Sequence, residues 1–170
     1  MIAAGSRRAH GEVAQSDLSA LAAPDALADV PSRIDALAQR LVGHRVCSIN
    51  LVHLETLEVE RIYCSDPAVY PLGGRRSKRG KEWAEQVLIR GEAYVGTQPS
   101  DLTRAFDEAA DHISRGLGSV INTPVMAGGR CLATLNLLHE PAWYRPEDQE
   151  LTRILAYLLV PYVVAEQAAR

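Results

Sequence analysis

The sequence predicts an α+β domain with a central, mainly antiparallel sheet of five or six strands. The first observation behind this fold class is the order of the periodic segments: helix, two strands, helix, short strand, helix, two strands, helix. The second is that the strands of each pair follow one another across a short turn. The third is the length of 170 residues, which is typical of one domain.

The N-terminal part of the chain is expected to be a tail followed by helices. Residues 1–15 are small, polar and aperiodic, so we expect a flexible tail there. A single folded domain is expected over residues 16–170. Ser16 and Asp17 can cap a first short helix, and an amphipathic helix follows Pro31.

The middle of the chain alternates between strand and helix signals. Two strands are expected at residues 46–54 and 57–64. Prolines and glycines then interrupt regular structure until a helix begins near Lys81. A short strand at residues 93–95 precedes a further helix, which runs through Phe106.

Residues 119–139 form the most informative segment, because two apolar strand candidates joined by two glycines carry one amide each. Alternation along a strand places successive side chains on opposite faces. If the hairpin pairs the faces that carry Asn122 and Asn136, both amides lie in one space. A buried amide needs hydrogen-bond partners. The candidate partners are a neighbouring backbone, an ordered water or a bound small molecule.

Composition excludes several classes of protein. The formal net charge of -3 argues against a general nucleic-acid binder, which normally carries a strongly basic face. The N-terminus has no apolar stretch long enough for a signal peptide. The longest uncharged apolar run, residues 154–165, is too short to span a bilayer. We therefore expect a cytoplasmic protein with no membrane partner.

The residues that most often bind metals show no metal-site pattern. Cys47, Cys64 and Cys131 lie in strand-like segments and are expected to be small core residues. The five histidines form no H-x-x-x-H pair. The sequence therefore predicts no metal site.

The order of elements and the hairpin GLGSVINTPVMAGGRCLATLNLLH resemble the GAF domain, the small-molecule-binding module of phytochromes, cyclic-nucleotide phosphodiesterases and many bacterial regulators. The resemblance covers about residues 33–165. It is greatest to short, stand-alone bacterial GAF proteins with an R-x-Y-x-S segment, then Y-P-x-x-G, a basic stretch and a Trp. In this sequence those positions are Arg61, Tyr63, Ser65, Tyr70, Pro71, Gly74, Arg76, Lys78 and Trp83.

This resemblance implies a layered fold and a pocket. The N- and C-terminal helices would cover one face of the sheet, and the middle helices and loops would cover the other face to enclose a pocket. The pocket face would then carry four polar residues, which is expected of a polar binding site. These residues are Ser48, Asn50, Asn122 and Asn136.

The segment GGRRSKRGKEW places five cations within seven residues. It does not fit a phosphate-binding P-loop, which needs a Lys followed by Ser or Thr after the correct spacer. A solvated loop, an anion site at the pocket mouth and a nucleic-acid contact are the alternatives. The last is not favoured, because one short patch neutralises few phosphates. For the anion site, the candidate ligand-binding residues are Arg76, Lys78 and Arg79.

Aromatic residues are scarce, and Tyr63, Tyr70 and Trp83 lie in the same part of the chain. An aromatic body with a polar tip suits a pocket wall that both packs against a ligand and orients it. Tyr70, in an irregular stretch, is the better wall candidate. Trp83 lies on an amphipathic helix, and both a core role and a wall role are open for it.

Catalysis is the less favoured use of such a pocket. Cys64 is the thiol best placed to face it, but the sequence offers no oriented base for Cys64. One branch of GAF proteins reduces free methionine sulfoxide with cysteines in the pocket-covering region, and this chain has no cysteine between Cys64 and Cys131. Hydrolytic or isomerising chemistry by Arg61, Tyr63 and Asp66 is left open. No cofactor is expected.

The leading hypothesis is a GAF module that binds a small polar, anionic metabolite as a sensor or accessory subunit. The alternatives are a small enzyme that uses the same pocket and a structural dimerisation module. The last helix begins near Pro146 and carries an apolar stripe wider than one core-facing side requires. We therefore expect a homodimer in which this helix and residues 33–42 meet a symmetry mate, with a bend at Pro161.

Overall fold

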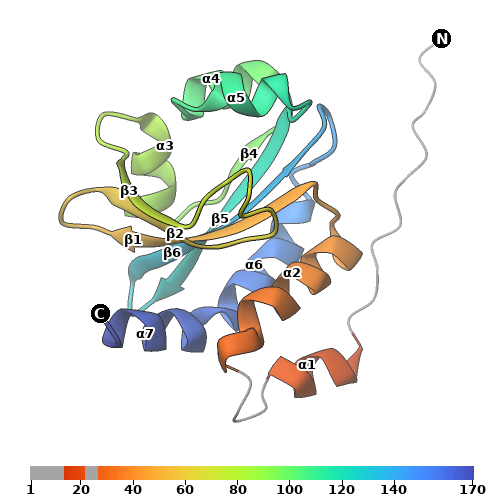
Figure 1. Ribbon diagram of the computed structural model, residues 1–170, viewed down its shortest axis with the longest axis vertical. Coiled ribbons are helices and arrows are strands. Elements are labelled where there is room, and N and C mark those ends of the chain that lie inside the picture. The colour runs from red at the N-terminus through yellow and green to blue at the C-terminus, as the bar shows by residue number, and fades with distance from the viewer. Residues whose placement is uncertain (1–13, 22–26) are drawn as a thin grey trace.

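The computed structural model describes residues 14–21 and 27–170 (Figure 1). The tail expected over residues 1–15 lies almost entirely outside the described residues, and so does part of the first expected helix. The described helices before the sheet are α1 (Gln15–Leu21), η1 (Leu27–Asp29) and α2 (Val30–Leu41).

A six-stranded antiparallel sheet forms the centre of the molecule, in the order β3-β2-β1-β6-β5-β4. The predicted α+β class and antiparallel sheet are confirmed. The strands are β1 (Val46–His53), β2 (Glu58–Cys64), β3 (Gly73–Ser77), β4 (Tyr94–Gly96), β5 (Ser119–Ala127) and β6 (Arg130–His139).

Helices cover the two faces of the sheet unequally (Figure 1). One face carries α2 together with the C-terminal helices α6 (Asp148–Leu158) and α7 (Val160–Ala168). The other face carries short helical segments, namely α3 (Glu82–Ala84), η2 (Glu85–Ile89), α4 (Pro99–Ala105) and α5 (Ala109–Ser114). None of the helices in the described part of the chain has the length and apolar character needed to cross a membrane.

The main hydrophobic core lies between the sheet and α2, α6 and α7. Ile34 and Leu37 of α2 pack there with Ile49 of β1, Leu135 of β6 and Leu155 of α6. On the other face the buried apolar residues form two smaller clusters instead of one. A cavity on this face is lined by residues of both clusters.

Three local predictions differ from the structure. Residues 73–77, expected as an irregular loop, form the edge strand β3. The glycines and cations of this segment are untypical of a central strand, but they are typical of an edge strand that is protected from further pairing. The helix expected through Phe106 is two helices, because Phe106 is extended after α4. The last helix, expected to be one helix with a bend at Pro161, is divided into α6 and α7 at Leu159, because Pro161 lacks the N–H that would continue the hydrogen bonds of the helix.

The apolar stripe of the last helix is divided between core and surface. Leu158 and Tyr162 are half-buried and pack against the main core. Ile154, Tyr157 and Val164 instead remain exposed.

Ser119 at the start of β5 joins three segments. Its buried hydroxyl donates to the carbonyl of Gly96 at 3.0 Å and accepts from the backbone N–H of Tyr144 at 3.0 Å. We expect Ser119→Ala to lower the free energy of unfolding by about 1–3 kcal/mol, since buried backbone groups lose a partner. Urea unfolding followed by circular dichroism measures this.

The matched control is Ser114→Ala. The Ser114 hydroxyl donates to the backbone carbonyl of Asp111 at an exposed helix end, so its loss should change stability by less than about 0.5 kcal/mol. Equal stability of Ser119→Ala and wild type would show that the Ser119 hydroxyl does not hold these segments together.

Candidate functional site

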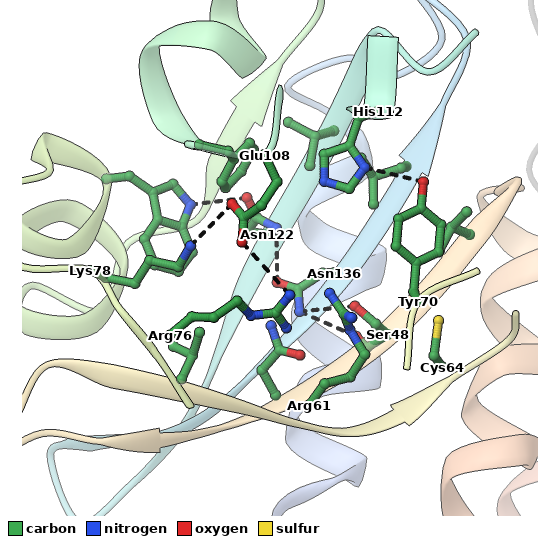
Figure 2. Close-up of a pocket in the computed structure, with 17 residues that line it drawn as sticks. Ser48, Arg61, Cys64, Tyr70, Arg76, Lys78, Glu108, His112, Asn122 and Asn136 are labelled. Atoms are coloured by element: carbon green, nitrogen blue, oxygen red, sulfur yellow. Dashed lines mark hydrogen bonds and ion pairs between the residues drawn. The ribbon is translucent and has the colours of Figure 1, made fainter. Parts of the chain in front are cut away.

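A cavity of about 60 Å³ lies between the sheet and the layer of short helices (Figure 2). This is room for a few water molecules or a small ligand. It is lined by Val46, Ser48, Asn50, Val59, Arg61, Cys64, Tyr70, Arg76, Lys78, Trp83, Phe106, Glu108, His112, Val120, Asn122, Asn136 and Leu138.

A chain of buried hydrogen bonds forms the floor of the cavity. Trp83 Nε1 donates to Asn122 Oδ1 at 3.0 Å, and Asn122 Nδ2 donates to Asn136 Oδ1 at 2.8 Å. Asn136 Nδ2 donates in turn to the carbonyl and hydroxyl oxygens of Ser48 at 3.3 and 3.4 Å. The register of the sheet produces this chain, because Asn136 is paired with Asn122 on one side and with Ser48 on the other.

Three cations and one carboxylate line the wall of the cavity (Figure 2). Arg61 comes from β2, Arg76 from β3, and Lys78 follows β3 with only 7% of its side chain exposed. Glu108, just before α5, lies 3.5 Å from Lys78 Nζ and 3.7 Å from Arg76. Among the described lining residues, positive charge therefore exceeds negative charge.

Burial and neighbouring charges perturb these groups. Burial lowers the pKa of Lys78. Burial and the positive charge of Arg76 both lower the pKa of Arg61. For Glu108 burial alone would raise the pKa, but the charges of Lys78 and Arg76 bring it below its ordinary value. The site thus holds a carboxylate that stays ionised among incompletely neutralised cations.

Two fully buried side-chain polar atoms of the lining residues have no hydrogen-bond partner within the described part of the chain. They are Asn50 Oδ1, an acceptor, and Arg61 Nε, a donor, and both are buried. The Arg61 guanidinium otherwise lies 5.6 Å from the centre of the Tyr70 ring and donates from Nη1 to the carbonyl of Pro71. Buried polar groups normally find a partner, so water or a bound molecule would have to satisfy these two atoms.

Tyr70 and His112 form a second polar pair at the wall. The Tyr70 hydroxyl lies 3.2 Å from His112 Nδ1, to which it can donate when the ring is neutral. Burial lowers the pKa of His112, which favours the neutral ring. Cys64 lies on the same side (Figure 2), and burial raises the pKa of its thiol.

The structure brings most of the predicted site residues together at this cavity. Those that line it are Ser48, Asn50, Arg61, Tyr70, Arg76, Lys78, Trp83, Asn122 and Asn136. Trp83 is both core and wall, since its ring packs among apolar residues while its N–H begins the amide chain.

Tyr63, Ser65 and Arg79 lie elsewhere. A bulge in β2 sets two residues against one of β1, so Arg61 opposes Asn50 while Tyr63 opposes Ile49. Tyr63 therefore turns to the helix-covered face, where its hydroxyl donates to an Asp35 carboxylate oxygen at 2.5 Å. Ser65 accepts a hydrogen bond from the Cys47 N–H, and exposed Arg79 donates to the Thr56 carbonyl.

Sequence reasoning missed Glu108 and His112. Their four-residue spacing places both on one side of a helical turn, but the residues between α4 and α5 gave no sign that this side faces the sheet. It also missed a group on the opposite face, where ligand atoms of Asp35, His44 and Cys47 lie within 4.8 Å of one another.

The architecture defines a class of protein: a single antiparallel sheet with terminal helices on one face and a polar pocket under short helices on the other. The family model of the GAF domain matches residues 32–160. The chain belongs to the GAF domain family. A search of curated proteins finds no match.

Solved structures show the same fold. A free methionine-R-sulfoxide reductase from Neisseria meningitidis, solved with its substrate, has a TM-score of 0.65 at 17% identity, and the match covers 97% of this chain and 100% of that one. The GAF domain of a phosphoenolpyruvate-protein phosphotransferase from Coxiella burnetii has a TM-score of 0.71 at 14% identity, with 91% and 92% covered. A GAF domain/HD domain protein from Geobacter sulfurreducens gives 0.67 at 14% identity, with 89% and 98% covered.

The lowered pKa of His112 predicts how stability depends on pH. Because the unfolded state binds this proton more readily, stability is fully present above the ordinary value of 6.5 and is lost as the pH falls toward the lowered pKa. Urea unfolding at about pH 7.5 and about pH 5.5 should show a smaller loss on acidification for His112→Gln than for wild type. Equal losses in both proteins would exclude His112 as a source of acid sensitivity.

Proposed function

We propose that this GAF domain binds a small anionic metabolite in the cavity and acts as a sensor or accessory subunit. The observation that carries this proposal is the excess of positive charge at the cavity: buried Lys78 and the partly buried Arg61 and Arg76 line it, with Glu108 as the one carboxylate among the described lining residues. An incompletely paired buried charge is costly. A ligand carboxylate or phosphate would supply the missing countercharge.

The polar groups of the cavity fit such a ligand. Arg61 Nε is an unused donor within the described residues, and a guanidinium can bind a carboxylate through two parallel hydrogen bonds. Asn50 Oδ1 offers an acceptor to a hydroxyl or amino group of the same ligand. The amides of Asn122 and Asn136 are occupied by each other, by Trp83 and by Ser48, so their role in this proposal is to hold the floor rigid.

The cavity volume limits the ligand. A cavity of about 60 Å³ suits a compound of a few heavy atoms, such as a short hydroxy, keto or amino acid, or phosphate itself. Glu108 bridges Lys78 and Arg76 at the wall, so its movement would enlarge the site toward these cations.

Binding is favoured over catalysis by the state of the thiol. Burial raises the pKa of Cys64, which keeps it protonated and weakly nucleophilic. Cys131 is buried, with its thiol donating to the Ala133 carbonyl, and Cys47 is buried on the opposite face. This arrangement does not support the cysteine chemistry of the methionine sulfoxide reductases that share the fold.

The ligand proposal predicts unequal roles for neighbouring cations. In a thermal-shift screen of small carboxylates and phosphate, a binding anion should raise the melting temperature, whereas its neutral amide should not. Arg76→Ala or Lys78→Ala should weaken binding by about 1.5–3 kcal/mol, the value of a charge-assisted hydrogen bond. Intrinsic tryptophan fluorescence gives the affinity, because Trp83, one of the two tryptophans, borders the cavity while Trp143 does not line it.

Arg79→Ala is the matched control, since it removes a cation of the same segment whose exposed side chain lies outside the cavity. It should bind like wild type. Equal binding of the anion and its neutral amide, or wild-type affinity in both Arg76→Ala and Lys78→Ala, would contradict the proposed anion site.

A homodimer through the C-terminal helices is the proposed assembly. Ile154, Tyr157 and Val164 expose large apolar side chains on α6 and α7, with exposed fractions of 54%, 75% and 47%. Neighbouring exposed apolar residues often mark an interface.

The three free, buried cysteines also support a cytoplasmic location, because thiols persist in a reducing compartment.

The assembly can be tested with exposed residues alone. Light scattering at micromolar concentration should give a dimer for wild type and a monomer for the pair Ile154→Asp, Tyr157→Asp, because a buried interface would then contain unpaired charges. Ile89→Asp, which changes an equally exposed residue of η2, should remain dimeric. A monomeric wild type would rule out this assembly, and a dimeric double variant would place the interface elsewhere.

A further inference from the structure

A cluster of three potential metal ligands lies on the helix-covered face of the sheet, away from the anion cavity. Asp35 belongs to α2, His44 to the connection that follows it, and Cys47 to β1. A carboxylate oxygen, a ring nitrogen and the sulfur of these residues lie within 4.8 Å of one another. We propose that Asp35, His44 and Cys47 form a binding site for a divalent transition-metal ion of the zinc class.

The geometry is close to that of a metal centre. His44 Nε2 lies 2.8 Å from Asp35 Oδ1. Zinc bonds of about 2.0–2.3 Å in a tetrahedral arrangement separate ligand atoms by roughly 3.3–3.8 Å. The metal would therefore replace the proton shared by Asp35 and His44, and Cys47 would move inward by a side-chain rotation.

The donor set selects the kind of metal. A thiolate, an imidazole and a carboxylate together suit zinc and similar borderline ions, whereas magnesium and calcium prefer oxygen ligands only. Tyr63 adds an outer partner, because its hydroxyl donates to Asp35 Oδ2 at 2.5 Å and would orient the carboxylate. Three protein ligands leave a fourth position for water.

A second observation supports the site independently of the spacing. The His44 side chain is only 6% exposed, and its Nδ1 is buried without a hydrogen-bond partner among the described residues. The imidazole therefore has unused binding capacity in a place where a buried polar atom is costly. Nε2 is the nitrogen that faces Asp35, so Nδ1 would become the ligand only after a rotation of the ring.

The surroundings provide both enclosure and access. Cys47 is fully buried in the main core, whereas the Asp35 side chain is 16% exposed and leaves a route from solvent. Coordination would release the thiol proton to water and form the metal–sulfur bond.

Cobalt(II) titration of the untagged protein after dialysis against a chelator tests the proposal. Cobalt takes zinc sites and gives a thiolate-to-metal absorption band in the ultraviolet only when sulfur is bound. We expect this band to saturate at one cobalt per chain and to disappear when zinc is added. A wild-type protein that shows no such band would overturn the proposal.

Variants identify the ligands. Cys47→Ala should lose the band, whereas Cys131→Ala, which removes an equally buried thiol on the other face, should keep it. Asp35→Asn preserves the shape of a partly exposed side chain and should weaken cobalt binding at least about tenfold, as should Tyr63→Phe through the outer shell. A band of wild-type affinity in Cys47→Ala or in Asp35→Asn would overturn the assignment, and circular dichroism verifies that each variant is folded.

Discussion

The hydrogen bond between Asn122 and Asn136 determines how one face of the sheet is built. Two amides in the middle of adjacent strands are costly to bury unless each finds partners. They find them in each other, in the Trp83 indole and in Ser48, so the polar chain crosses β5, β6 and β1. This line separates the buried apolar residues of that face into two groups, while the partly buried Tyr94 and Phe106 pack against both groups. The core of that face is consequently divided into two clusters, with the cavity lined by both.

The charges of the cavity are arranged around this polar floor. Arg76 faces it because Arg76 pairs with Val59, whose side chain also lines the cavity. Glu108 partly neutralises Arg76 and Lys78 but leaves Arg61 paired only with the Tyr70 ring and a backbone carbonyl within the described contacts. Thus two strands and the residue that follows β3 supply the cations, and the short-helix layer supplies the carboxylate. A shift of that layer would change the balance of charge without any change in the sheet.

The fold could be predicted from the sequence because its signals are periodic, whereas the site could be predicted only where alternation is regular. Asn122 and Asn136 share a face as alternation requires. Tyr63 does not follow this rule, because one extra residue in β2 reverses the faces, and nothing in the local composition announces the bulge. Glu108 and His112 were missed for a different reason. Their contact with the cavity depends on how a short-helix layer docks, which periodicity does not encode.

Strand β1 carries polar residues to both faces of the sheet. Ser48 and Asn50 line the cavity, while Cys47 turns toward Asp35 and His44 on the other side. Alternation alone separates these neighbouring positions. The spacing His44-x-x-Cys47 is short, but only the turn from α2 into β1 brings both side chains back to Asp35, nine residues before His44 in the chain. A search for regular metal-binding motifs therefore overlooks a cluster that a helix-to-strand connection assembles.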